Sequence, residues 1–173
     1  PAKLMEWLNQ GMAISVNAVT SHGGMVNKFT GDGMLAVFGA PVSAGPGADA
    51  AQALAAARSI QAGIFNLNQT LKQRGSAALR LRIGIHSGVV LTGSLGSRER
   101  LEYAVIGDTV NCASRLESLN KEHHQGLVRV LVSSTTLVLA GESLEQPSLI
   151  DWGEVTVKGR QEAIRVFDLG QDV

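Results

Sequence analysis

This 173-residue sequence lacks the features that mark secreted, membrane-spanning or nucleic-acid-binding proteins. Its single cysteine, Cys112, cannot form a disulfide within the chain, and no signal peptide with a basic start and a cleavage site is visible. No apolar run approaches the roughly 20 residues that a membrane span needs. Fifteen basic residues balance fifteen acidic ones, so the positive field that attracts nucleic acid is missing. These absences predict a cytoplasmic location, no transmembrane segment and no nucleic-acid partner.

The composition is that of one globular domain. Hydrophobic residues make up 45% of the chain and charged residues 17%, and the length is enough to bury a single core. Residue 1 is a proline, and a helical pattern begins almost at once. We therefore expect residues 1–173 to form a single domain that is N-terminally truncated, with a regulatory domain upstream in the parent protein.

Hydrophobic periodicity predicts helices interspersed with short strands. Helices are expected at 4–21, 49–73, 109–122 and 133–139, and strands at 25–30, 34–38, 79–85, 103–106, 128–132, 148–157 and 164–169. The segment 87–96 is expected to be a glycine-bearing loop, and Asp108 or Thr109 to cap the third helix. This order predicts an α+β fold with a mixed, mostly antiparallel sheet flanked by helices.

The segment 28–33, KFTGDG, places Asp32 on a tight turn between two apolar strands. A carboxylate held there is rigidly aimed and partly solvated, which suits a hard divalent cation. An aspartate is also common in such turns without any ligand. The turn alone therefore leaves both interpretations open.

The segment 103–117, YAVIGDTVNCASRLE, places Asn111 and Arg115 four residues apart on a predicted helix. Side chains at this spacing share a face, and an amide beside a guanidinium suits a phosphate whose charge grows during a reaction. Alternatively, Asn111 satisfies backbone groups and Arg115 pairs with a surface acid. A third motif, VKGR at 157–160, predicts a basic hairpin tip, which by itself is typical of a solvated turn.

Together and in this order, the motifs resemble the class III adenylyl and guanylyl cyclase family. The resemblance covers nearly the whole chain, and its most specific parts are KFTGDGMLAVFGAP at 28–41, RIGIHSGVVLTGSLG at 82–96, EYAVIGDTVNCASRLE at 102–117 and VKGR at 157–160. It implies the class III nucleotidyl cyclase fold, which is related to ferredoxin-like topology. It also implies a head-to-tail homodimer in which each active site draws residues from both subunits.

The resemblance further implies a reaction and a role for each motif. ATP would be converted to 3′,5′-cyclic AMP and pyrophosphate, with two divalent cations, Mg²⁺ or Mn²⁺, as cofactors. Asp32 matches one of two family aspartates that hold these cations, and it would face Asn111 and Arg115 of the other subunit. Asn111 would orient the ribose, and Arg115 would stabilise charge on the α-phosphate. Lys158, with Arg160 as the nearby alternative, would hold the terminal phosphates.

Two positions bear on the choice of base. Lys28 stands where adenylyl cyclases of the family carry a lysine and guanylyl cyclases usually carry glutamate. A lysine donates to adenine N1, whereas guanine N1–H needs an acceptor. Ala104 stands where adenylyl cyclases commonly have aspartate or threonine to accept from the adenine amino group, and alanine cannot do so. Lys28 therefore favours ATP, while Ala104 keeps guanylyl cyclase open as an alternative.

One family motif does not occur in the sequence. The first metal-binding aspartate of the family lies in a motif like Phe-x-Asp-Ile-x-Gly-Phe-Thr, before the first helix. We expect that the sequence begins after that strand. The alternative is a catalytically silent domain that binds nucleotide or dimerises.

Overall fold

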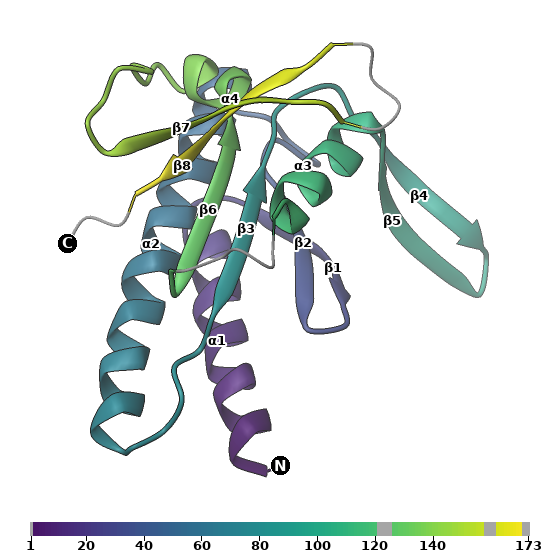
Figure 1. Cartoon of the computed structure of the whole chain (residues 1–173). Helices are drawn as coiled ribbons and strands as arrows, with labels where there is room; N and C mark the ends of the chain where they lie inside the picture. The colour runs from purple at the N-terminus through teal and green to yellow at the C-terminus, as the bar shows by residue number, and fades with distance from the viewer. Residues whose placement is uncertain (1, 121–125, 158–161, 171–173) are drawn as a thin grey trace.

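A computed structural model of the chain describes residues 2–120, 126–157 and 162–170 (Figure 1). Its helices within these ranges are α1 (Ala2–Ser21), α2 (Pro46–Gln73), α3 (Asp108–Ser118) and α4 (Ser134–Leu139). Its strands are β1 (Met25–Thr30), β2 (Gly33–Val37), β3 (Leu81–Ile85), β4 (Leu91–Ser97), β5 (Arg100–Ile106), β6 (Val128–Ser133), β7 (Leu149–Val155) and β8 (Ile164–Leu169). Of the helices in this part of the chain, none combines the length and apolarity that crossing a bilayer needs.

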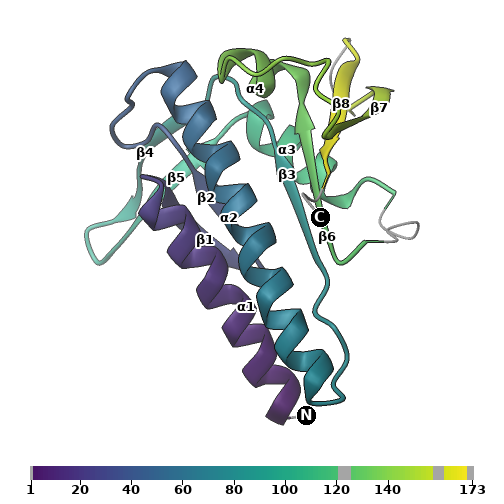
Figure 2. The same ribbon diagram turned by 90° about the vertical axis from the view of Figure 1, so that its left-hand side faces the viewer.

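The centre of the fold is a mixed sheet with the strand order β3-β6-β8-β7. β3 and β6 run parallel, whereas β8 is antiparallel to both β6 and β7. Alternate residues of β6 point to opposite faces: Val130 and Val132 pack with α1 and α2, and Leu131 packs with α3. Figures 1 and 2 show the α1–α2 pair on one side of the sheet and α3 on the other. The predicted α+β fold with a helix-flanked mixed sheet is confirmed.

The long helix α2 supplies much of the core on the α1 side. It is rich in alanine, the residue that favours helix most, and it buries Leu54, Ile64 and Leu71 almost completely. These residues recur at spacings of ten and seven, so they lie on one stripe of the helix. The helix begins at Pro46, three residues before the predicted start at Asp49, because proline fits the first turn of a helix.

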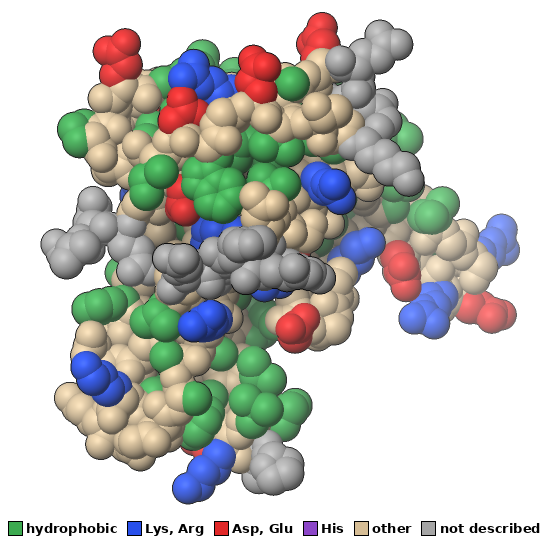
Figure 3. Space-filling view, in the orientation of Figure 1, with side chains coloured by type: hydrophobic (Ala, Val, Ile, Leu, Met, Phe, Trp, Pro, Cys, Tyr) green, Lys and Arg blue, Asp and Glu red, His purple; other side chains and the backbone are tan. Residues whose placement is uncertain are grey.

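Two antiparallel ribbons lie outside the central sheet, β1–β2 and β4–β5. The first confirms the predicted hairpin at 25–38. The second corrects the loop predicted at 87–96, because residues 91–97 form β4 and pair with all of β5. Every residue of β4 is exposed, so the strand has no buried face to produce an alternating pattern. Figure 1 shows this ribbon projecting from the body of the molecule, and Figure 3 shows acidic and basic side chains together at its tip.

The ends of α3 differ from the prediction. The helix stops at Ser118, before the predicted end at 122, and its N-cap is Gly107, with φ 152° and no side-chain cap. Neither Asp108 nor Thr109 caps it, because the Thr109 hydroxyl instead donates to the Val89 carbonyl oxygen at 2.8 Å. The following short helix α4 is capped by Ser133, whose Oγ accepts from the Thr136 N–H at 3.4 Å.

Candidate active site

Helix α3 presents Asn111 and Arg115 on its exposed face, as their four-residue spacing predicts. Its opposite face is formed by Thr109, Cys112 and Leu116, of which the last two are fully buried. Cys112 and Leu116 pack against the sheet with residues of β6 and β8. The helix therefore buries one face against the sheet and directs an amide and a guanidinium outward from the opposite face.

The helix lies unusually close to β3. A side chain at Gly84 would place its Cβ 2.1 Å from the Ala113 carbonyl oxygen and 2.4 Å from the Glu117 nitrogen, so only glycine permits this approach. The N-terminal end is fixed by the hydrogen bond from Thr109 to Val89. Packing and hydrogen bonding at separate points along its length thus leave α3 little freedom to shift or turn.

Asp32 lies exposed in the turn between β1 and β2. The preceding Gly31 has φ 63°, a left-handed conformation that glycine adopts without strain. In Figure 1 this turn lies at the end of the ribbon that points away from α3. Within one chain, the structure therefore does not bring Asp32 together with Asn111 and Arg115.

The donor set for a metal ion is small in this chain. Among the described residues, no three His, Cys, Asp or Glu side chains form a group that could hold a metal. Mg²⁺ commonly takes one or two carboxylates and completes its shell with waters and substrate phosphates. Asp32, a single exposed carboxylate on a tight turn, fits as one ligand of an ion that is held mainly by a bound triphosphate.

The positions predicted to face the base, Lys28 and Ala104, are linked through their neighbours. β1 has a bulge between Val26 and Lys28, which leaves Asn27 without a partner in the ladder. The Asn27 side-chain amide instead donates to the carbonyl oxygen of Tyr103 at 2.7 Å. This bond joins the β1–β2 ribbon to β5, one residue from Lys28 on one side and one residue from Ala104 on the other.

Asn27 was not predicted from the sequence. The available signal was an asparagine inside an apolar strand, a residue type that strands disfavour. Bulges often redirect a side chain next to a functional site. The predictions for Lys158 and Arg160 fall on residues 158–161 and so lie outside the described residues.

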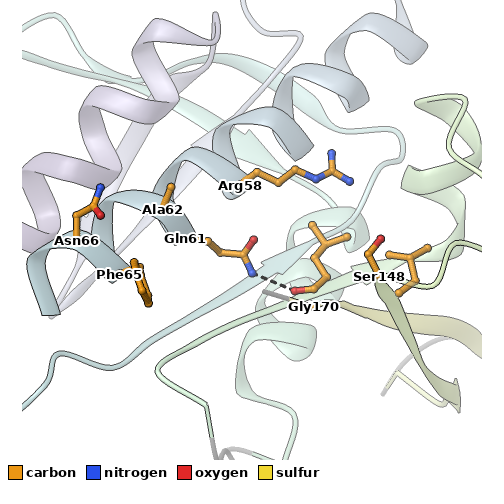
Figure 4. Close-up of a pocket in the computed structure, with 9 residues that line it drawn as sticks. Arg58, Gln61, Ala62, Phe65, Asn66, Ser148 and Gly170 are labelled. Carbon is orange, nitrogen blue, oxygen red and sulfur yellow. Dashed lines mark hydrogen bonds between the residues drawn. The ribbon is translucent and has the colours of Figure 1, made fainter. Parts of the chain in front are cut away.

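A shallow cavity of about 230 Å³ lies on another part of the surface, between α2 and the ends of β7 and β8 (Figure 4). Arg58, Gln61 and Phe65 line it from α2, and Ser148 and Gly170 line it from the strand ends. The Gln61 amide crosses part of it to donate to the Leu169 carbonyl oxygen at 3.0 Å. None of the predicted site residues in the described ranges lines this cavity, so it is separate from the candidate site.

The sheet face beneath α3 carries two opposite charges, those of the buried Arg129 on β6 and the half-buried Asp168 on β8. Burial raises the pKa of Asp168 to about 6, although the positive charge of Arg129 and a hydrogen bond from the Val130 N–H both act in the opposite direction. Burial likewise lowers the pKa of Arg129. Both shifts reflect the cost of removing charge from water.

Asp168 is therefore expected to make stability depend on pH. Its pKa is near 4 in an unfolded chain and about 6 in the fold, so the folded state binds more protons between these values. The contribution of Asp168 to the free energy of unfolding is therefore largest below pH 4 and is lost as pH rises through 6. Asp168→Asn removes this dependence, and urea unfolding at pH 4 and pH 7 measures it. From pH 4 to pH 7, the free energy of unfolding of the wild type should fall by about 1–2 kcal/mol relative to that of the variant, allowing for partial solvent screening. If the difference in unfolding free energy between wild type and variant is the same at pH 4 and pH 7, this assignment is contradicted.

Comparison with known sequences found a matching family and several longer relatives. The model of the family described as Adenylate and Guanylate cyclase catalytic domain matches residues 1–169. Adenylate cyclase 1 of Rhizobium meliloti is 32% identical over 169 residues, covering 98% of this chain and 24% of that protein. An uncharacterized protein of Mycobacterium tuberculosis is 38% identical over 166 residues, covering 95% of this chain and 28% of that protein. The chain thus spans about a quarter of the length of these curated relatives.

Solved structures named for both activities share the fold. A crystallised guanylyl cyclase matches with a TM-score of 0.78 at 31% identity, covering 99% of this chain and 82% of that one. The adenylyl cyclase CyaB from P. aeruginosa matches with a TM-score of 0.80 at 26% identity, covering 98% of this chain and 83% of that one. Overall similarity therefore does not separate an adenine from a guanine substrate.

Proposed function

Because this chain belongs to the family of adenylate and guanylate cyclase catalytic domains, we propose that it converts ATP to 3′,5′-cyclic AMP and pyrophosphate. The observation that carries the proposal is the pairing of Asn111 with Arg115 on the outer face of a helix that packs closely against β3. The ribose 3′-hydroxyl oxygen attacks the α-phosphorus, the bond to the bridging oxygen of the β-phosphate breaks, and pyrophosphate leaves with that electron pair. The hydroxyl proton passes to solvent.

Each residue has one task in this reaction. Arg115 donates hydrogen bonds to the α-phosphate oxygens, where negative charge increases in the transition state. Asn111 holds the ribose so that its 3′-hydroxyl lies in line with the leaving group. Lys158 or Arg160 binds the terminal phosphates. When bound, divalent cations, Mg²⁺ or Mn²⁺, neutralise the triphosphate and favour ionisation of the attacking hydroxyl, and Asp32 would provide one of their ligands.

We also propose that the active protein is a head-to-tail homodimer. In the β4–β5 ladder, Leu91 lies opposite Ile106 and Gly93 opposite Ala104, so these residues share one face with Leu95. The exposed fractions are 73% for Leu91, 64% for Leu95 and 54% for Ile106. An isolated two-stranded ribbon is only marginally stable in water, and adjacent apolar side chains at a surface indicate a binding face. A second copy of the chain would cover this face and bring its Asp32 to the first copy's α3.

The curated relatives are about four times as long as this chain. We propose that a regulatory domain precedes the cyclase domain in the parent protein and that the reaction takes place in the cytoplasm.

Full-length protein incubated with ATP and Mn²⁺ should form cyclic AMP and pyrophosphate in equal amounts. A catalytically silent nucleotide-binding domain would instead retain ATP and release neither product.

Lys28 is expected to decide between ATP and GTP. The wild type should turn over ATP faster, because the ammonium donates to adenine N1 and repels no group of that base. Lys28→Glu should lower kcat/KM for ATP about 10–100-fold, the value of one hydrogen bond to a charged group, and should raise kcat/KM for GTP. Lys72→Glu, the same charge change in the last turn of α2, is the matched control.

GTP is the second candidate substrate, and Ala104 is the observation that favours it. Alanine leaves the exocyclic amino group of adenine without an acceptor, which typically costs about 1 kcal/mol. Parallel assays of both nucleotides distinguish the candidates. Faster turnover of GTP by the wild type would replace the adenylyl assignment with a guanylyl one.

A further inference from the structure

The C-terminal end of α3 is held by a buried arginine from the sheet. The last carbonyl groups of a helix have no partners within it, and glycine often ends a helix by allowing a turn that satisfies them. Here Arg129 of β6, only 3% exposed, supplies the donors. Its guanidinium donates to the carbonyl oxygens of Glu117 at 3.1 Å, Asn120 at 3.3 Å, and Leu119. A positive charge at this end also complements the helix dipole.

Residues of the neighbouring strands surround the Arg129 guanidinium. It lies 5.2 Å from the centre of the Trp152 ring of β7, and the Asp168 carboxylate of β8 provides the opposite charge. Arg82 is its neighbour in the β3–β6 pair, and Arg82 Nε donates to the Glu117 carboxylate at 2.9 Å. Arg129 Nε has no hydrogen-bond partner within the described residues. The terminal nitrogens of Arg129 are therefore the ones that bond to the end of α3.

We propose that Arg129 is a positioning residue for the cyclase reaction, fixing the last turn of α3 and through it the guanidinium of Arg115. This inference rests on the proposed function of Arg115. Arg115 lies four residues before Leu119, one helical turn from the carbonyls that Arg129 holds. Burying a guanidinium carries a large desolvation cost, and an apolar residue of similar size would pack at least as well. A role in orientation explains why a charged group occupies this site.

The test replaces Arg129 with methionine, which keeps much of the volume and removes the donors. Arg129→Met should lower kcat about 10–100-fold at nearly unchanged KM, because a displacement of about 1 Å in a catalytic group has effects of this size. Arg129→Lys keeps the charge and some of the donors, so it should recover part of kcat. It also provides the test if Arg129→Met does not fold. Amide hydrogen exchange should become faster in residues 115–119 of either variant and stay unchanged in α2.

The matched control is Arg165→Met. Arg165 of β8 also lies over an aromatic ring, that of Phe167 at 5.5 Å, and pairs with Asp151. It is exposed and lies on the other side of β8 from Ile164 and Val166, which pack with α3. Arg165→Met should therefore leave kcat and the exchange of α3 unchanged. If the control lowers kcat as much as Arg129→Met does, the inference is overturned.

A double substitution separates this role from general stability. In an Arg115→Ala background, Arg129→Met should lower kcat less than twofold further, because the group that it positions is already gone. An equal loss in both backgrounds would overturn the positioning role and leave the proposed function intact. A wild type that forms no cyclic nucleotide would overturn the proposed function and this role with it. Hydrogen exchange would still show whether Arg129 anchors α3.

Discussion

Arg115→Ala is expected to lower kcat for cyclic AMP formation about 10²–10³-fold, the typical loss for a dedicated donor to transition-state charge. The change in KM should be small, because the guanidinium acts mainly on charge that develops during the reaction. The α3 backbone should be unaffected, since Arg115 is exposed and the packing face is formed by residues such as Cys112 and Leu116. Product formation followed by chromatography at saturating ATP measures the effect.

Two further variants sharpen this result. Arg115→Lys keeps the positive charge but loses the planar pair of donors, so its kcat should lie between those of the wild type and Arg115→Ala. Arg74→Ala, at the end of α2, removes an arginine far along the chain from the proposed machinery and should leave kcat unchanged. If Arg115→Ala retains more than about a third of wild-type kcat, Arg115 is not the transition-state donor, since loss of such a donor lowers kcat far more.

Asp32→Ala is expected to abolish measurable turnover with Mg²⁺. The carboxylate is exposed on a hairpin tip, so its loss should leave the free energy of unfolding within about 0.5 kcal/mol of wild type. A second readout does not depend on turnover: titration of Mn²⁺ into the complex with a non-cyclisable ATP analogue should show weaker binding. Glu145→Ala removes an exposed carboxylate from the loop before β7 and should affect neither measurement. Unaltered Mn²⁺ affinity in Asp32→Ala would remove Asp32 from the metal site.

The elements that bury apolar side chains could be predicted from the sequence. α1 shows apolar residues at helical spacing, whereas the β1–β2 hairpin and β6, which is buried on both faces, show short apolar runs of strand length. β4 could not be predicted because all its residues are exposed. Its glycines also suggested a loop. The end of α3 was placed four residues too late because its last carbonyls find their donors on Arg129, ten to twelve residues later in a separate strand.

The candidate site also has residues that could be predicted from the sequence and residues that could not. Asn111 and Arg115 were predictable as a pair because the spacing of helical side chains is a local property. The contribution of Gly84 depends on a helix packing directly against a strand, and that of Asn27 depends on a bulge and a contact with β5. Both are tertiary features that leave little trace in local sequence. The separation of Asp32 from α3 within one chain, which the family resemblance implied, is seen in the fold (Figure 1).

That separation leads to the central claim, a site shared between two subunits, and one measurement tests it directly. Asp32→Ala and Arg115→Ala proteins, each inactive alone, are mixed under conditions that allow subunits to exchange. A mixed dimer then has one site with both substitutions and one with neither. Random exchange makes half of the dimers mixed, so activity should return to about one quarter of the wild-type value. If mass measurement shows mixed dimers and no cyclic AMP forms, Asp32 and Arg115 do not meet across a subunit interface.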